Sequence, residues 1–192
     1  MRALIVIDVQ NEFSMKGLRP VPGHAAILSV IHRHVADARE NGYPIAWIRH
    51  HNLPSESPAF IPGSWGAEFS PGFGPKPDHS KEVEFQKNVY GAFTGTKLGS
   101  WLSRLGITEI LVAGFYTHGC VSTTCREAIM AGLEVVVDPE ATGACDITHI
   151  RLGNMTAEEV RRSALLQLVN MGAQISSPRG QEHLHQRSEH RQ

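Results

Sequence analysis

Short apolar runs alternate with amphipathic segments along most of the chain. Residues 3–8 form a continuous apolar run that ends at an aspartate, a pattern typical of a strand buried in a parallel sheet. Residues 25–41 have the periodicity of an amphipathic helix, and Gly42 follows where a glycine commonly ends one. The same reasoning predicts further strands at 45–49, 83–85, 109–113, 133–137 and 173–175, and further helices at 96–105, 119–131 and 156–171.

Strands that alternate with helices indicate an α/β fold with right-handed crossovers and a parallel sheet covered on both faces. Ligands of such sheets bind at the carboxyl ends of the strands, where the strand order reverses. The long Pro-, Gly- and Ser-rich segment at 51–80 interrupts the alternation, and a loop of this length in a compact domain is usually functional or mobile. We therefore look for chemistry in residues that directly follow strands.

Composition narrows the class of protein. The 192 residues are 41% hydrophobic and 19% charged, with a formal net charge of −1, which favours neither nucleic acid nor a membrane as a partner. We expect one domain over residues 1–178 and a polar, disordered tail at 179–192. Three cysteines without paired spacing, and no signal-peptide pattern, lead us to expect free thiols and a cytoplasmic protein.

Asp8 and Lys87 follow predicted strands and are candidates for chemistry. An aspartate that ends a buried strand needs a partner, so it is either a site residue or a turn cap. Lys87, in the segment 87–93, is by itself more consistent with a solvated surface charge than with a functional role.

Cys120 lies where the loop after the strand at 109–113 becomes a helix. N–H groups at a helix start favour negative charge, so this position is expected to stabilise a thiolate and to offer oxyanion donors. The alternative is a buried cysteine acting as a small hydrophobe, which is how we interpret Cys125 and Cys145. His118 is a second possible base for the thiol. The eleven histidines show no zinc-like spacing with a carboxylate or thiol, so we expect no metal.

Three of these segments resemble the motifs of the isochorismatase-like hydrolases, also called cysteine hydrolases. The first is Asp8-Val9-Gln10-Asn11, the second Lys87 with residues 90–93, and the third residues 114–121 with Thr124 and residues 126–128. Residues 141–144 and Asp146 match the loop after the fifth strand. The three motifs stand in the family's order, each after a strand, and the resemblance covers residues 5–175.

The resemblance implies a three-layer sandwich with a six-stranded parallel sheet, and homodimers or homotetramers. It also implies an Asp8–Lys87–Cys120 triad that needs no cofactor. Asp8 would take the thiol proton, Lys87 would favour the thiolate, and the backbone N–H groups of Tyr116 and Cys120 would form the oxyanion hole after a cis peptide between Phe115 and Tyr116. The implied reaction is hydrolysis of a C–N bond in a small amide, ureido or carbamoyl compound through an acyl enzyme.

Branches of the family differ in ways that bear on the substrate. Nicotinamidases carry an Asp-x-His pair for a metal after the second strand, whereas this chain has Arg49-His50-His51-Asn52 there. Isochorismate-cleaving members hydrolyse a vinyl ether and typically lack the cysteine. Ureidoacrylate, biuret, carbamoylsarcosine and maleamate hydrolases remain as models. The alternatives are a vinyl ether hydrolase that does not require the thiol and a catalytically silent binding subunit.

A pocket for the small substrate is expected beneath the long loop. Aromatic side chains there and near the motifs would form apolar walls, and a polar side chain would bind the polar end of the substrate. The residues expected to line it are Phe13, Trp65, Gln86, Tyr90, Phe93 and His118.

Overall fold

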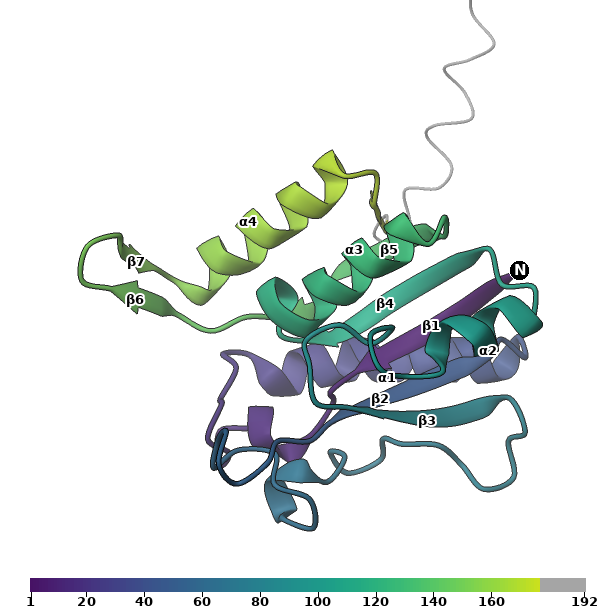
Figure 1. The fold of residues 1–192 in the computed structure, drawn as a ribbon, viewed down its shortest axis with the longest axis horizontal. Helices are drawn as coiled ribbons and strands as arrows, with labels where there is room; N and C mark the ends of the chain where they lie inside the picture. The colour runs from purple at the N-terminus through teal and green to yellow at the C-terminus, as the bar shows by residue number, and fades with distance from the viewer. Residues whose placement is uncertain (177–192) are drawn as a thin grey trace, which may run out of the picture.

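A six-stranded parallel sheet forms the centre of the protein, in a computed structural model that describes residues 1–176 (Figure 1). The strand order is β3-β2-β1-β4-β5-β8, and every pairing in this sheet is parallel. The predicted α/β class and parallel sheet are confirmed. The strands of the sheet are β1 (Arg2–Ile7), β2 (Ile45–His50), β3 (Glu82–Lys87), β4 (Glu109–Phe115), β5 (Glu134–Gly143) and β8 (Gln174–Ile175).

Helices cover both faces of the sheet, which makes three layers (Figure 1). Side chains of β1 alternate between the two faces, as the pleat of a strand requires. Leu4 and Val6 pack in the cluster that includes helix α1, whereas Ile5 and Ile7 pack in the cluster that includes α2, α3 and α4. The helices are α1 (His24–Glu40), α2 (Leu98–Arg104), α3 (Ser122–Met130) and α4 (Ala157–Asn170).

The strand order reverses between β1 and β4. The chain proceeds from β1 outward to β2 and β3, and then returns to the other side of β1 for β4, β5 and β8. In a doubly wound sheet, the carboxyl ends of the two central strands diverge at this switch point and leave room for a ligand. Asp8 directly follows β1, and Cys120 lies five residues after β4 ends at Phe115.

The segment between β5 and α4 differs from the predicted loop. It contains an antiparallel hairpin of β6 (Ile147–His149) and β7 (Gly153–Met155), which projects from the body of the molecule (Figure 1). The helix predicted at 119–131 also differs, because its first residues belong to a π-helical turn at Thr117–Val121 that precedes α3. The helix predicted at 156–171 is present as α4, and a capping box formed by Thr156 and Glu159 opens it. The predicted tail at 179–192 lies outside the described residues.

The long segment between β2 and β3 is largely irregular, as predicted, with one 3-10 turn at Trp65–Ala67. No helix within residues 1–176 is long and apolar enough to cross a lipid bilayer.

Candidate active site

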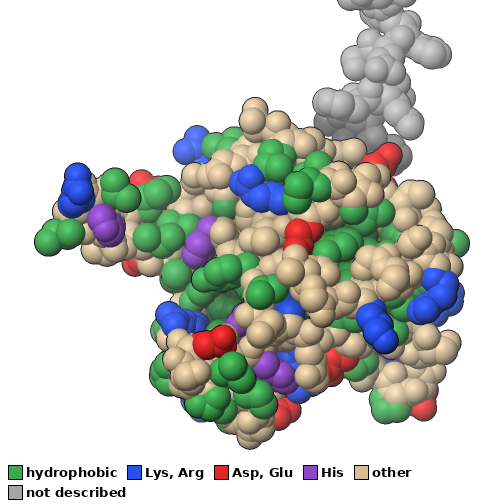
Figure 2. All heavy atoms as spheres, viewed as in Figure 1, with side chains coloured by type: hydrophobic (Ala, Val, Ile, Leu, Met, Phe, Trp, Pro, Cys, Tyr) green, Lys and Arg blue, Asp and Glu red, His purple; other side chains and the backbone are tan. Residues whose placement is uncertain are grey.

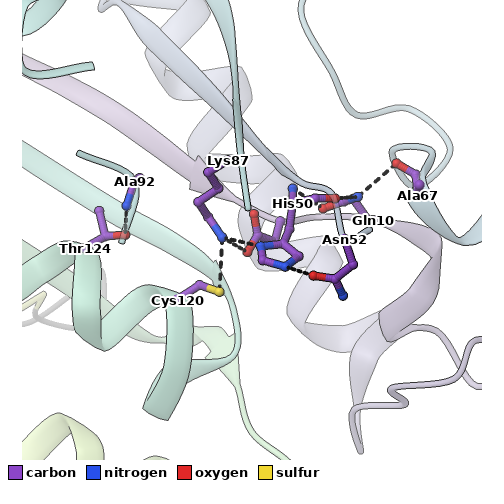
Figure 3. Close-up of polar contacts among 9 residues, drawn as sticks. Gln10, His50, Asn52, Ala67, Lys87, Ala92, Cys120 and Thr124 are labelled. Atoms are coloured by element: carbon purple, nitrogen blue, oxygen red, sulfur yellow. Dashed lines mark hydrogen bonds and ion pairs between the residues drawn. The ribbon is translucent and has the colours of Figure 1, made fainter. Parts of the chain in front are cut away.

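Asp8, Lys87 and Cys120 meet at the carboxyl edge of the sheet, although they are far apart in the sequence. Figure 3 shows the contact between Lys87 and Cys120. The Lys87 Nζ lies 2.8 Å from Asp8 Oδ2 and 3.2 Å from Cys120 Sγ. The side chains of Asp8 and Lys87 are almost wholly buried. The second carboxylate oxygen of Asp8, Oδ1, is buried without a hydrogen-bond partner among the described residues. This oxygen is therefore free to accept a proton.

The backbone around Asp8 brings β1 and β4 close together. Asp8 has a φ of 51°, which turns the chain sharply as it leaves the strand. Gly114, opposite Ile7 in β4, has a φ of 128°, and a Cβ atom there would lie 1.9 Å from the Ile7 carbonyl oxygen. A side chain at position 114 would thus push apart strands β1 and β4, which Asp8 and Cys120 follow.

His50 is a member of the site that the sequence did not single out. It is the last residue of β2, the strand between β1 and β3, and it pairs in register with Lys87. Its Nδ1 lies 3.0 Å from Lys87 Nζ, and its Nε2 lies 2.7 Å from Asn52 Oδ1 (Figure 3). The signal available in the sequence was its position at the end of a strand, the criterion that identified Asp8 and Lys87.

Charge in the site is concentrated on the Asp8–Lys87 pair. Burial works against the charge of the Lys87 ammonium, but the neighbouring Asp8 and Cys120 outweigh it and raise its pKa. Burial raises the pKa of the Cys120 thiol, Asp8 raises it further, and Lys87 opposes this shift only in part. These surroundings favour the thiol form of Cys120, whereas a helix start was expected to favour the thiolate. Burial and the Lys87 charge lower the pKa of His50, so its ring is neutral.

The turn that carries Cys120 is supported from beneath by hydroxyl groups. Thr142 in β5 donates to the Gly114 carbonyl, and its hydroxyl oxygen lies 2.9 Å from that of Thr117, which is fully buried. The peptide bond between Phe115 and Tyr116 is cis, as the resemblance implied. The start of the nucleophile turn is thus attached both to β4 and to β5.

The segment after Lys87 is attached to the helix that follows the nucleophile. The backbone N–H of Ala92 donates to Thr124 Oγ1 at 3.1 Å, and that of Phe93 donates to Glu127 Oε2 at 2.9 Å (Figure 3 shows the first of these bonds). Thr124 and Glu127 both belong to α3. This arrangement fixes the distance between the lysine strand and the cysteine turn.

Gln10 connects β2 to the long loop through peptide groups. Its Nε2 donates to the carbonyl oxygens of His50 and Ala67, each at 2.9 Å, and its Oε1 accepts from the His50 N–H at 2.8 Å (Figure 3). The side chain is fully buried. Gln10 therefore holds both backbone polar groups of His50.

Asn11 and Glu12 hold the same loop in a similar way. Asn11 Nδ2 donates to the carbonyl oxygen of Trp65, and Glu12 Oε1 accepts from the N–H of Phe60. Both side chains are buried. Residues 10–12 thus attach the loop that is expected to cover the substrate to the end of β1.

Three of the residues expected to line the pocket pack against the core or point away from Lys87. Phe13 is enclosed in the core and 3% exposed. Phe93 packs against the cluster beneath α2. Gln86 precedes Lys87 in β3, so its side chain points to the opposite face of the sheet, where it donates to Glu84.

The other three lie nearer the surface. Trp65 and Tyr90 are 53% and 67% exposed, and the Tyr90 ring lies 3.7 Å from where a Cβ on Gly119 would be. The His118 ring stacks on that of Tyr116, with 5.2 Å between the centroids, and burial lowers its pKa. No hydrogen bond joins His118 to the thiol in the described part of the chain. Of these three residues, Tyr90 is therefore the one whose ring borders the Thr117–Val121 turn from another segment of the chain.

A metal ion does not fit the site as it stands. Asp8, His50 and Cys120 each offer a ligand atom, and these atoms lie within 4.8 Å of one another. The Lys87 ammonium lies within hydrogen-bonding distance of all three residues, and the other nitrogen of His50 is bonded to Asn52. A metal ion at this place would have to displace the Lys87 ammonium, so no chemical step is assigned to a metal.

Comparisons with known proteins agree with this geometry. A family model described as the isochorismatase domain matches residues 2–177. A nicotinamidase/pyrazinamidase from Mycobacterium tuberculosis is 33% identical over 83% of this chain and 97% of its own length. A streptothricin hydrolase from Streptomyces noursei is 30% identical over 77% of this chain and 51% of its own length.

The fold is shared with solved structures as well. A crystal structure described as an isochorismatase from Pseudomonas putida superposes with a TM-score of 0.83 at 28% identity. The superposition covers 91% of this chain and 87% of the other. The motif order, the six-stranded sheet and the family match lead to one conclusion: the chain belongs to the isochorismatase-like hydrolase family.

Proposed function

We propose that this protein is a cysteine hydrolase that cleaves a C–N bond in a small amide, ureido or carbamoyl compound without a metal. The observation that carries the proposal is the position of the Lys87 ammonium, which contacts both Asp8 Oδ2 and Cys120 Sγ while Asp8 Oδ1 has no partner. A base, a cation and a nucleophile are thereby assembled in one buried cluster. The family relatives named for amide substrates support the same reaction class.

In the first half of the reaction, the Cys120 proton passes to Asp8 Oδ1 as the sulfur attacks the carbonyl carbon. Because the pKa of the thiol is raised, the proton leaves during the attack, when the sulfur forms its bond to carbon. We assign the oxyanion to the backbone N–H groups of Tyr116 and Cys120. Asp8 then gives its proton to the leaving nitrogen, the C–N bond breaks, and a thioester remains on Cys120.

In the second half, water attacks the thioester and Asp8 accepts the proton of that water. The C–S bond breaks, the acid leaves, and the proton on Asp8 returns to the Cys120 sulfur. Lys87 stays protonated throughout, because Asp8 and Cys120 raise its pKa despite its burial. Its role is to counter the negative charge that passes between the carboxylate and the sulfur.

The test is a panel of small amides, ureido acids and carbamoyl compounds assayed for ammonia release with wild type and Cys120→Ala. We expect turnover in wild type, its loss in Cys120→Ala, and an acyl adduct on Cys120 by mass spectrometry. Cys145→Ala is the matched control, because Cys145 is a free thiol that forms no part of the triad. Turnover that survives in Cys120→Ala would contradict the covalent scheme and favour a vinyl ether hydrolase.

We further propose that the protein assembles as a homodimer or homotetramer through the face that carries the β6–β7 hairpin. Hydrophobic side chains gather along this projection (Figure 2), where Ile150 and Leu152 are 98% and 86% exposed. An adjoining groove is lined by Met155, Leu166 and Met171 together with polar and charged side chains of α3 and α4. Exposed apolar side chains on a projecting element, bordered by polar residues, are typical of protein contacts.

Light scattering coupled to size exclusion tests the assembly. We expect Ile150→Ser combined with Leu152→Ser to lower the measured mass, whereas Leu18→Ser, at an exposed apolar residue in another segment, leaves it unchanged. A monomeric wild type would contradict the proposal.

A further inference from the structure

Each proton of the Lys87 ammonium has its own acceptor. An ammonium carries three N–H donors and no acceptor. Its neighbours are Asp8 Oδ2 at 2.8 Å, Cys120 Sγ at 3.2 Å and His50 Nδ1 at 3.0 Å (Figure 3). Since Lys87 can only donate, His50 Nδ1 must accept and must carry a lone pair. The proton of the neutral ring is therefore on Nε2.

Asn52 leads to the same tautomer from the other side of the ring. Its Nδ2 donates to the carbonyl oxygen of Ala59 at 3.1 Å, which sets the orientation of the amide because a carbonyl can only accept. Asn52 Oδ1 then faces His50 Nε2 at 2.7 Å, and Nε2 must donate to it. Two independent contacts thus assign the same proton.

The imidazole has little freedom to leave this position. Gln10 bonds both the N–H and the C=O of His50, so the backbone at this residue is fixed. The ring packs edge-on against Phe60, with 5.3 Å between centroids. The register pairing of His50 with Lys87 places the two side chains on the same face of the sheet.

We propose that His50, held in its Nε2–H tautomer by Asn52, is a positioning residue that aims the Lys87 ammonium at Asp8 and Cys120. This inference rests on the proposed function, since it assigns a role within that triad. His50 does not act as a second base: one ring nitrogen already carries a proton, and the lone pair of the other is used by Lys87. The free acceptor in the triad remains Asp8 Oδ1.

A neutral acceptor suits this place better than a charged one. The ammonium already faces the Asp8 carboxylate, and a second anion at position 50 would draw the Nζ away from Cys120 or raise the pKa of the thiol further. A side chain without an acceptor would leave one N–H of a buried ammonium without a partner, which is costly. Imidazole provides the acceptor without adding charge.

Two substitutions separate positioning from packing. His50→Asn retains an acceptor oxygen near the place of Nδ1, and His50→Leu retains bulk without an acceptor. We expect His50→Leu to lower kcat roughly 10- to 100-fold with little change in KM, in keeping with the loss of a hydrogen bond to a charged group, and His50→Asn to recover much of this loss. Equal activity in wild type and His50→Leu, or equal impairment in both variants, would overturn the proposal.

Two further readouts do not depend on finding a substrate. The rate of Cys120 alkylation by iodoacetamide should fall roughly tenfold in His50→Leu and recover in His50→Asn. Nitrogen-15 NMR of wild type should show His50 as the Nε2–H tautomer, and the Nδ1–H tautomer or an imidazolium would overturn the proposal even if His50→Leu fails to fold. Failure of the amide panel with the expected tautomer and alkylation pattern would count against the proposed function alone.

Discussion

Glu127 in α3 accepts a 2.9 Å hydrogen bond from the backbone N–H of Phe93, six residues after Lys87. The same carboxylate lies 3.2 Å from the N–H of Thr94. Because α3 begins directly after the nucleophile turn, this carboxylate couples the position of the lysine strand to that of Cys120. Residues well outside the triad therefore determine how closely its members approach one another.

Gly91→Ala should disturb this connection. A Cβ at position 91 would lie 2.2 Å from Glu127 Oε1, so the carboxylate must move away from the N–H groups that it binds. We expect a loss of about 1–3 kcal/mol in the free energy of unfolding and a lower kcat. Urea unfolding and steady-state kinetics measure both effects, and Glu127→Ala should produce a similar result. Gly91→Ala with wild-type kinetics would show that the connection is not needed for catalysis.

Lys87→Met should destabilise the fold, because it leaves the buried Asp8 carboxylate without its ion partner. The expected loss is roughly 3–5 kcal/mol in urea unfolding, and Asp8→Asn in the same chain should restore part of it. Arg161→Met is the control, since its two carboxylate partners, Glu140 and Glu158, are both largely exposed and each pair should contribute less than about 1 kcal/mol. A double variant no more stable than Lys87→Met would argue against coupling between the two charges.

Asp8→Asn should make Cys120 more reactive toward iodoacetamide while abolishing turnover. The pKa of the thiol is raised by burial and then by the Asp8 charge. Removing the negative charge lowers this pKa, so more thiolate is present at a given pH and alkylation becomes faster. Mass spectrometry of the Cys120 peptide across a pH series measures the shift. A pH profile displaced to higher pH would contradict the assigned role of Asp8.

Gly114→Ala should cost at least about 3 kcal/mol of stability, because its Cβ would collide with the backbone of Ile7. Gly153→Ala is the matched control: its φ of 83° is also positive, but nothing lies within 4 Å of its Cβ position. Conformational strain alone costs about 1–2 kcal/mol. Thermal or urea unfolding should separate the two, and equal losses would mean that strands β1 and β4 can separate at this point.

The parallel sheet was predictable from local rules, and the positions of Asp8, Lys87 and Cys120 after strands made them candidates. Their grouping as a triad was implied by the resemblance to the family, since Lys87 by itself is more consistent with a surface charge. Continuous apolar runs indicate buried parallel strands, and chemistry collects at their carboxyl ends. His50 carried the same signal as Asp8 and Lys87, a place at the end of a strand. Its partnership with Lys87 could not be predicted, because it depends on the register between two strands, which a single sequence does not contain. The orientation of Gln86 could have been predicted, since adjacent residues of a strand point to opposite faces of the sheet and Gln86 directly precedes Lys87.

Other features depend on tertiary packing. The thiol pKa was expected to fall at a helix start, but burial beside Asp8 raises it, and neither factor can be read from the residues around Cys120. The β6–β7 hairpin was missed because each of its strands has three residues, too few to show a period. Its apolar residues had no pattern that would distinguish them from a loop.

The loop between β2 and β3 is held by side chains that recognise peptide groups. The side chains of Gln10, Asn11 and Glu12 form these hydrogen bonds with backbone atoms of the loop. These bonds fix part of the path of the loop from outside it, and buried loop residues such as Ala59 and Phe60 fix the rest by packing in the core. Exposed positions such as Trp65 can change without altering the frame that carries them, so substrate preference in this scaffold can diverge while the catalytic geometry is inherited intact.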